Sequence, residues 1–321
     1  MNATPTVQPW ILLAAGLLLL ALAAFFIYKN KKSKKSSYTD IALAIPETRR
    51  SDLIYGFYSS LTGTYEAVKD QVNLFWHSNF LNGGDEEFIN ILKSTNHKVV
   101  FDLARFLTVQ KDVTPWYKEL LMKLKIVKNK KKFKGVYNPE GETALRAYFQ
   151  WLKDLGVLHK ISYLYPKDEP NLFVLNPEEH LKMIQVTKRL RSEFSELANA
   201  RIACIYGNGK PYWNLAEHDV VGVDDYGQKS QILTIGAHAK LVQEKAPHQR
   251  TMLIPGPSFG HKPDPWVAYA LLNPEEVEMV IPFVWFDNVN HKDTAYTGLE
   301  AMPEDFKAQW KHAADICLNR A

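Results

Sequence analysis

Cysteine is scarce in this chain, which has only Cys204 and Cys317 in 321 residues. Two cysteines so far apart are too few for the disulfide framework of a small secreted domain, and they do not have the paired spacing of a zinc site. They leave the redox compartment of the protein open.

Several motifs that identify enzyme classes are also missing. No glycine-rich phosphate loop follows the first apolar segment, which argues against a dinucleotide-binding fold. The spacing shows no metal-binding triad, no nucleophile elbow and no Cys–His–Asn set, so no cofactor is expected. The net charge is only +4, and the lysine-rich stretches account for more than that. The rest of the chain is therefore nearly neutral, and no nucleic-acid partner is expected.

One long apolar run stands near the N-terminus. Residues 10–28 (WILLAAGLLLLALAAFFIY) contain no charge and are close to the roughly 20 residues that cross a bilayer as a helix. A cleaved signal peptide is the alternative, but no positive charge precedes the run and no A-x-A site follows it. The sequence therefore predicts a single transmembrane anchor over 1–28, with the membrane as a partner through residues 10–28.

Residues 29–51 are predicted to be a basic flank and tether. Five lysines follow the apolar run within seven residues. Such a flank normally lies on the cytoplasmic side, which would place the following domain there as well. The residues at the ends of the predicted strands favour the opposite side, because the kind of ligand that they suit lies mostly outside the cytoplasm. The membrane side of the domain is therefore left open.

Residues 52–321 alternate between apolar, β-prone segments and amphipathic segments of helical period. The candidate strands are 53–59, 72–78, 98–104, 161–166, 201–206, 219–226, 250–256 and 278–286. The candidate helices are 85–94, 114–126, 142–155, 178–198, 229–243, 264–272 and 303–318. Eight strand–helix units in about 270 residues predict an α/β fold, a (β/α)8 TIM barrel preceded by the transmembrane helix; an open doubly wound sheet is the alternative.

One stretch does not fit eight simple units. Residues 133–138 could form a ninth strand or belong to an insertion between the third and fourth strands. The lysine-rich run Lys123–Lys134 before it favours an insertion over about 123–141. The lysines are read as solubilising in preference to phosphate-binding.

In a TIM barrel the site lies where the strands end, at their carboxyl termini. The polar and aromatic residues at those ends form an acidic and aromatic set, which suits sugars because aromatic faces cover the C–H side of a pyranose while carboxylates accept hydroxyl hydrogen bonds. The candidate catalytic residues are Asp168 and Glu169, which end the fourth strand. The candidate substrate-binding residues are Tyr58, His77, Asp102, Tyr206, Asp225, Tyr226 and Trp285.

Three short motifs carry a resemblance to a known group of proteins. YLYPKDEPN at the fourth strand, VVGVDDYG at the sixth and IPFVWFD at the eighth resemble TIM-barrel glycoside hydrolases, over about residues 52–318. In the large clan of retaining barrel glycosidases the acid/base is a Glu at the end of strand four, and Glu169 matches that place. Their nucleophile is a Glu at the end of strand seven, where this chain reads TMLIPGPSFG without a carboxylate.

Retaining hexosaminidases with an Asp-Glu pair at strand four are a second resemblance. They use the acetamido oxygen of the substrate as nucleophile, which implies that Glu169 protonates the leaving oxygen while Asp168 stabilises the oxazolinium ion. Tyr226 would then donate to the acetamido carbonyl. Together with the predicted anchor, the resemblance implies a membrane-anchored hydrolase of a polysaccharide or glycoconjugate. A non-catalytic carbohydrate-binding or scaffolding barrel is the rival. An amidohydrolase on the same barrel is a weaker alternative, because the sequence lacks the histidines that would bind its metal.

Overall fold

Residues 49–58, 62–77, 85–128, 131–207, 209, 211–224, 231–283 and 298–320 are described by a computed structural model. All of them belong to one compact unit, residues 43–321. The predicted anchor and nearly all of the predicted tether lie outside the described residues. Within the described ranges, no helix combines the length and the apolar character needed to cross a membrane.

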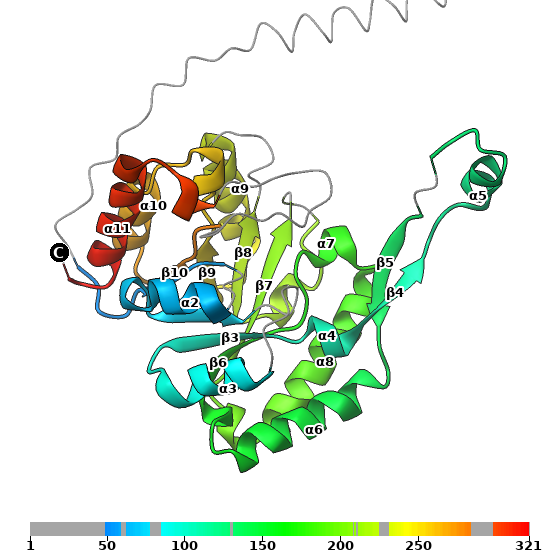
Figure 1. The fold of residues 1–321 in the computed structure, drawn as a ribbon, viewed down its shortest axis with the longest axis horizontal. Helices are drawn as coiled ribbons and strands as arrows, with labels where there is room; N and C mark the ends of the chain where they lie inside the picture. Colours follow the sequence, from blue (N-terminus) through cyan, green and yellow to red (C-terminus); the bar gives the residue numbers. More distant parts are fainter. Residues whose placement is uncertain are drawn as a thin grey trace, which may run out of the picture. The chain divides into compact units, whose positions relative to one another are not determined.

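Eight parallel strands form a barrel (Figure 1). In spatial order they are β1 (Ile54–Tyr55), β10 (Val277–Val280), β9 (Arg250–Leu253), β8 (Val220–Asp224), β7 (Arg201–Gly207), β6 (Ile161–Tyr165), β3 (Lys98–Asp102) and β2 (Leu74–His77). Each pairs in parallel with its neighbour. All eight overlap the strands predicted from the sequence, so the prediction of an eight-stranded parallel barrel is confirmed.

The barrel closes between β1 and β2, the two ends of that order. The backbone N–H of Asn73 donates to the Tyr55 carbonyl at 3.0 Å, and the Asn73 side-chain oxygen accepts from the Tyr55 N–H at 2.7 Å. Gly56 makes this approach possible, because a Cβ there would lie 2.6 Å from the Leu74 Cβ.

Side chains alternate between the two faces of the barrel wall, as strand geometry requires. Apolar side chains that point inward from all eight strands fill the interior as one buried cluster, for example Ile54, Trp76, Val100, Tyr163, Ile205 and Met279. The neighbouring residues point outward and pack under the helices, in a larger cluster that includes Tyr55, Phe75, Phe101 and Leu164 and in a smaller one that includes Cys204 and Val221. Both faces are buried, which explains why the strands read as nearly continuous apolar runs.

Helices surround the barrel. They are α2 (Thr62–Val68), α3 (Asp85–Ser94), α4 (Ala104–Leu107), α6 (Gly141–Asp154), α7 (Pro170–Phe173), α8 (Pro177–Glu193), α9 (Gln231–Glu244), α10 (Asp264–Leu272) and α11 (Glu304–Cys317). Helix α8 begins as its sequence predicts, because the Asn176 side chain accepts a hydrogen bond from the Glu179 N–H at 2.9 Å and Pro177 occupies the first helical position. Six of the seven predicted helices match these bounds within a few residues.

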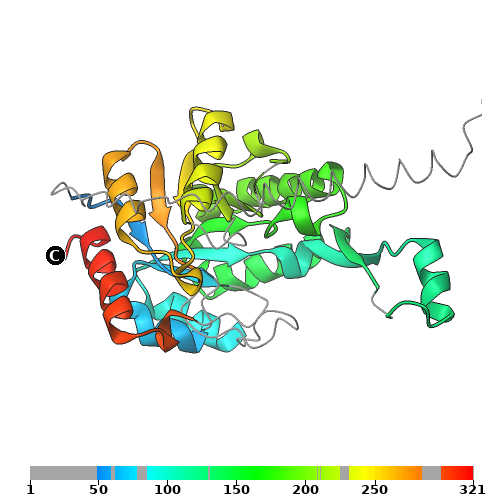
Figure 2. The same cartoon turned by 90° about the horizontal axis from the view of Figure 1, so that it is seen from above.

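The stretch between β3 and β6 is the predicted insertion. Strands β4 (Thr108–Asp112) and β5 (Phe133–Tyr137) pair as an antiparallel ribbon outside the barrel sheet. The ribbon carries α5 (Trp116–Lys123), which overlaps the seventh predicted helix. Both views place this arm away from the barrel wall (Figure 2). The sequence placed β5 in an insertion correctly, but it missed β4, whose residues are mostly polar and exposed.

Candidate active site

Four carboxyl groups come from the carboxyl ends of three barrel strands. Asp102 is the last residue of β3, Asp224 is the last residue of β8, and Asp168 with Glu169 follows β6 by three and four residues. Asp102 and Asp224 are buried, while Asp168 and Glu169 are half-buried. Acidic groups at this end of a parallel barrel occupy the position where barrel enzymes place their chemistry.

Glu169 has a backbone conformation that is uncommon for a residue with a side chain. Its φ is 40° and its ψ is 56°, in the left-handed region. The Glu169 N–H donates to the Ile205 carbonyl of β7 at 3.1 Å, and the residue precedes Pro170, the first residue of α7. This conformation turns the chain out of β6 and directs the Glu169 carboxyl over the neighbouring strand.

Gly207 at the end of β7 provides the space for that carboxyl. A Cβ at position 207 would lie 2.7 Å from Glu169 Cδ and 2.5 Å from Leu172 Cδ1. The Asn171 side chain holds the same strand end in place. Its Nδ2 donates to the carbonyls of Gly207 at 2.7 Å and Gly209 at 2.9 Å, and its Oδ1 accepts from the Gly207 N–H at 3.1 Å. The turn after β6 and the end of β7 therefore form one connected unit around Glu169.

Asp168 is held by tyrosine hydroxyls. The Tyr165 hydroxyl, from inside the barrel, donates to Asp168 Oδ1 at 2.6 Å, and the Tyr58 hydroxyl after β1 is a second donor. Trp76 contacts both tyrosine rings, with centroids 4.9 Å apart in each case. The carboxylate thus sits at the edge of an aromatic wall contributed by the first, second and fourth strands of the barrel.

The electrostatics set Glu169 apart from an ordinary surface carboxyl. Burial raises the pKa of Glu169 far above its usual range, and the nearby Asp224 and Asp168 charges raise it further. Asp224 is also the acceptor of a hydrogen bond from the protonated Glu169 side chain. The Lys167 ammonium group opposes this shift without cancelling it. Glu169 therefore keeps its proton at neutral pH, because a negative charge on it would be repelled by the neighbouring carboxylates.

Two aspartates of the cluster respond in the same direction. Burial raises the pKa of Asp168, although hydrogen bonds from the tyrosine hydroxyls favour its charged form. Burial also raises the pKa of Asp102 to about 6, while the Ala104 N–H, which donates to Asp102 Oδ1 at 2.8 Å, favours the carboxylate. The cluster can hold one proton and still present ionised oxygens.

The structure brings together Tyr58, Asp102, Asp168 and Glu169, and it separates them from two other predicted site residues. His77 points outward from β2 and stacks on Phe88 of α3, with ring centroids 4.0 Å apart. Burial, and then the Arg105 charge, lowers the pKa of His77 to about 4. Tyr206 also points outward, and its hydroxyl donates to the Trp213 carbonyl at 2.7 Å. Strand alternation is the reason: Trp76 and Gly207 are the inward neighbours.

The remaining predicted residues, Asp225, Tyr226 and Trp285, lie outside the described residues. Three residues of the cluster were missed at the sequence level: Tyr165, Lys167 and Asp224. Asp224 directly precedes Asp225, the residue that the strand-end rule selected instead. Counting in twos from the inward Val220 and Gly222 would have placed Asp224 inside the barrel, so the signal was present in the sequence.

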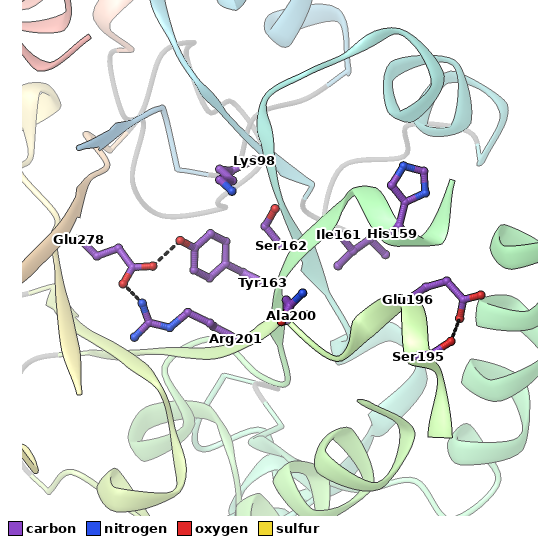
Figure 3. Close-up of a pocket in the computed structure, with 11 residues that line it drawn as sticks. Lys98, His159, Ile161, Ser162, Tyr163, Ser195, Glu196, Ala200, Arg201 and Glu278 are labelled. Atoms are coloured by element: carbon purple, nitrogen blue, oxygen red, sulfur yellow. Dashed lines mark hydrogen bonds and ion pairs between the residues drawn. The ribbon is translucent and has the colours of Figure 1, made fainter. Parts of the chain in front are cut away.

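A cavity of about 580 Å³ lies at the other end of the barrel, where the strands begin (Figure 3). Its lining includes Lys98, Tyr163 and Arg201, and Glu278 accepts hydrogen bonds from both the Tyr163 hydroxyl and the Arg201 guanidinium. Residues at this face of a barrel serve mainly stability. The paired Arg201 and Glu278 charges fit that role, so the cavity is distinct from the carboxyl cluster.

No protein-family model matches the sequence, and no curated protein does. The structure is similar to barrel domains of glycoside hydrolases. A β-glucuronidase from Bacteroides uniformis matches with TM-score 0.45 and 9% identity, over 74% of this chain and 31% of that one. The GH53 catalytic domain of Ignisphaera aggregans matches with TM-score 0.42 and 12% identity, over 77% and 89%. A GH2 β-galacturonidase from Eisenbergiella tayi matches with TM-score 0.48 and 11% identity, over 84% and 52%.

These matches extend over several glycoside hydrolase families and single out none. The chain spans about a third of the first of these proteins and about half of the last. At such identities and TM-scores nothing about chemistry transfers from one protein to another. What this barrel does has to be worked out from its own side chains.

Proposed function

We propose that this barrel is a glycoside hydrolase acting on a polysaccharide or glycoconjugate, with Glu169 as its general acid. The observation that carries the proposal is the placement of Glu169, a carboxyl at the mouth of a parallel barrel that a left-handed backbone turn holds over Gly207, where burial and the Asp224 and Asp168 charges raise its pKa. Cleavage of a glycosidic bond requires a proton for the leaving oxygen, and a carboxylic acid with a raised pKa supplies it.

The neighbouring residues define the proposed steps. Glu169 donates its proton to the leaving-group oxygen, and negative charge appears on its carboxylate. Asp168, held by two tyrosine hydroxyls, is the group proposed to face the positive charge that develops on the sugar. Water then attacks the anomeric carbon, and the Glu169 carboxylate takes up the proton released by that water.

The nucleophile is proposed to belong to the substrate. The seventh barrel strand, β9, is followed by Ile254, Pro255 and Gly256, so it presents no carboxylate there. An acetamido oxygen on the substrate would fill this role, with Asp168 stabilising the oxazolinium ion. Tyr226, outside the described residues, remains the proposed donor to the acetamido carbonyl. Tyr58, Asp102 and Trp285 are proposed to contact the sugar.

A non-catalytic carbohydrate-binding barrel is the second candidate, and the missing strand-seven carboxylate favours it. Such a protein would keep the aromatic wall of Tyr58, Trp76 and Tyr165 but would not need a protonated Glu169. A hydrolase does need that proton, and the burial of the Glu169 carboxyl beside Asp168 and Asp224 is what holds it there. The hydrolase therefore explains a feature of the cluster that the binding barrel leaves unexplained.

The test uses the full-length protein in detergent with aryl N-acetylhexosaminides and mixed glycans as substrates. Hydrolysis by the wild type and a loss of about 10²-fold or more in Glu169→Gln support general acid catalysis. Asp168→Asn should then lose turnover as well; unchanged turnover in that variant would eliminate substrate assistance. Glycan binding without turnover in every form would establish the second candidate.

The predicted anchor at residues 10–28 would attach this barrel to a membrane. Two arguments about the side of the membrane on which the barrel lies oppose each other: the lysine flank favours the cytoplasm, and the proposed carbohydrate substrate favours the other side. A C-terminal reporter that is active on only one side of the membrane decides between them. Activity on the cytoplasmic side would restrict the substrate to glycans made or degraded there.

A further inference from the structure

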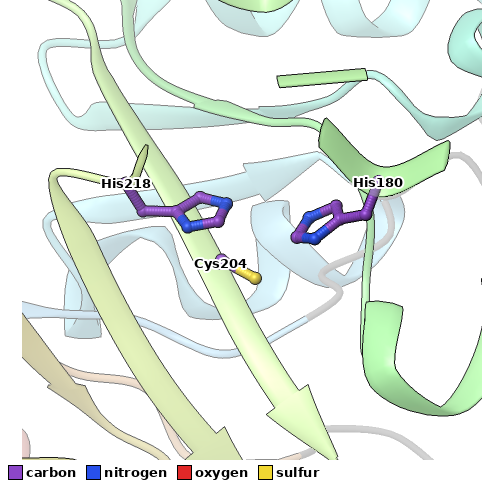
Figure 4. A group of neighbouring side chains, drawn as sticks. All are labelled: His180, Cys204 and His218. Atoms are coloured by element: carbon purple, nitrogen blue, oxygen red, sulfur yellow. The ribbon is translucent and has the colours of Figure 1, made fainter. Parts of the chain in front are cut away.

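Two histidines and a cysteine meet in the wall of the barrel, away from the carboxyl cluster. His180 comes from α8, Cys204 from the outward face of β7, and His218 from the turn that precedes β8 (Figure 4). One donor atom from each residue lies within 4.8 Å of the other two. All three side chains are at most 1% exposed.

The two imidazoles have unsatisfied nitrogens. His180 Nε2 and His218 Nε2 are buried without a hydrogen-bond partner. The opposite ring nitrogens contact neighbouring polar groups, with His180 Nδ1 3.4 Å from the Asn214 amide and His218 Nδ1 3.5 Å from the Tyr206 hydroxyl. Buried polar atoms are nearly always paired, so two open nitrogens beside one thiol need an explanation.

We propose that His180, Cys204 and His218 bind a thiophilic d10 metal ion, copper(I) or zinc, through the two Nε2 atoms and the Cys204 sulfur. Thiolate and imidazole are the ligands that these ions prefer. Ligand distances of about 2.0–2.3 Å place donor atoms about 3.5–4 Å apart, so the group closes by up to about 1 Å on binding.

The surroundings fit this assignment. Both rings are fully buried, which favours the neutral imidazole, and a neutral imidazole has a lone pair for a metal. The Tyr206 hydroxyl donates to the Trp213 carbonyl, so its oxygen can accept from His218 Nδ1–H, which leaves Nε2 as the ligand atom. For His180, the same tautomer requires the Asn214 amide to turn its Oδ1 toward the ring, which gives up the hydrogen bond that Asn214 Nδ2 donates to the Pro177 carbonyl at 2.9 Å.

Charge favours copper(I) over zinc. Binding converts the Cys204 thiol to a thiolate and releases one proton to solvent, so copper(I) with one thiolate is electrically neutral. Zinc would leave a net positive charge in a fully buried place, which is unfavourable. No change of oxidation state is involved, and three ligands are a sufficient set for copper(I).

The experiment is metal titration of the full-length protein, purified without oxygen. Copper(I) is supplied as its bicinchoninate complex, and zinc as its chloride in a separate series. We expect one equivalent to bind and the thermal midpoint to rise with added metal. Binding of either ion supports the site, and the two series show which one it prefers. Less than about 0.1 equivalent bound, with no shift of the midpoint for either ion, would overturn the proposal.

Variants locate the ion. Cys204→Ser and His218→Gln should weaken binding by about 100-fold or more. Cys317→Ser is the matched control, because Cys317 is the other buried free thiol and lies in α11. Equal loss in the Cys317 variant would contradict the assignment. Because the thermal shift with metal is measured on the wild type, it tests the proposal even if a variant fails to fold.

The arm formed by β4, α5 and β5 carries a second inference. Helix α5 has no buried side chain, so nothing in the barrel stabilises it. Most of the large apolar side chains that are exposed in the described residues belong to this arm, including Trp116 at 76% and Ile126 at 65% exposure. Between Val109 and Lys134 the sequence has nine lysines and two acidic residues.

We infer that this arm binds an anionic lipid surface. Segments that lie in the membrane interface typically combine exposed tryptophan, tyrosine and leucine side chains with lysines. The basic charge selects anionic lipid over a neutral apolar partner. The predicted anchor would keep the domain close to a bilayer, which raises the effective concentration of lipid at the arm.

The test places the full-length protein in nanodiscs of phosphatidylcholine with or without phosphatidylglycerol. A fluorophore on Leu120→Cys should be quenched by brominated lipid in the anionic discs, and the quenching should weaken in high salt. A label on Leu272→Cys is the control, since Leu272 of α10 is also exposed. No quenching at position 120 in either lipid, or shielding of that label by a second protein copy, would refute the inference.

Discussion

Glu169→Gln should stabilise the folded protein at neutral pH while it removes the proposed proton donor. The folded-state pKa of Glu169 is raised, above the value of about 4.3 expected in the unfolded chain. Between those two pKa values the folded state binds more protons than the unfolded state, so the contribution of Glu169 to the free energy of unfolding falls as pH rises. Glutamine has no such proton linkage, and it can still donate a hydrogen bond to Asp224.

The magnitude follows from the pH interval. One pKa unit corresponds to about 1.36 kcal/mol, so the cost of keeping Glu169 protonated from about pH 4.3 to pH 7 is at most roughly 3.7 kcal/mol. Because Asp168 and Asp224 share the proton, a gain of about 1–3 kcal/mol at pH 7 is expected. The gain should shrink toward zero near pH 4, where glutamate is protonated in both states.

Urea unfolding of the full-length protein in detergent at pH 4.5, 6 and 7.5 measures this dependence, with domain unfolding followed by tryptophan fluorescence. Glu300→Gln is the control, since Glu300 is an exposed carboxylate in a turn before α11. A Glu169→Gln gain that is the same at every pH would mean that titration of this carboxyl is not its cause. Destabilisation at pH 7.5 would refute the reasoning.

Other substitutions test the parts that position Glu169. Gly207→Ala should displace the Glu169 carboxyl, reduce hydrolysis by about 10²-fold and destabilise the barrel by about 1–3 kcal/mol, as measured by kinetics and urea unfolding. Asn171→Ala leaves the Gly207 N–H without its acceptor and should cost about 1–3 kcal/mol, again by urea unfolding. His77→Phe should leave hydrolysis unchanged and keep or raise the thermal midpoint, because the His77 ring stacks on Phe88 of α3 and Phe101 of β3; a large loss of activity would return His77 to the site.

The sequence was sufficient to predict the barrel and part of the carboxyl cluster. Eight apolar segments separated by amphipathic ones gave the strands in the correct order, because a parallel strand buried on both faces has a clear signature. Asp168 and Glu169 were found because they end an apolar run and precede a proline. Asp102 and Tyr58 followed from the same rule about strand ends.

The rule failed where the direction of a side chain mattered. His77 and Tyr206 are the wrong residues of their strands for a position inside the barrel, because a shift of one residue exchanges the two faces. The group formed by His180, Cys204 and His218 could not be found from spacing, since α8, β7 and the turn before β8 bring it together only in the folded chain. The left-handed turn at Glu169 likewise depends on the Ile205 and Gly207 contacts of the neighbouring strand.

The central claim is that Glu169 gives its proton to the leaving group, and the most direct measurement varies the leaving group. Wild type and Glu169→Gln are compared on aryl glycosides that range from poor to good leaving groups. Loss of the acid should reduce kcat/KM by about 10²-fold or more for a poor leaving group and should have little effect for dinitrophenolate, which departs without a proton. Equal loss across the whole series, or no loss anywhere, would contradict the assignment.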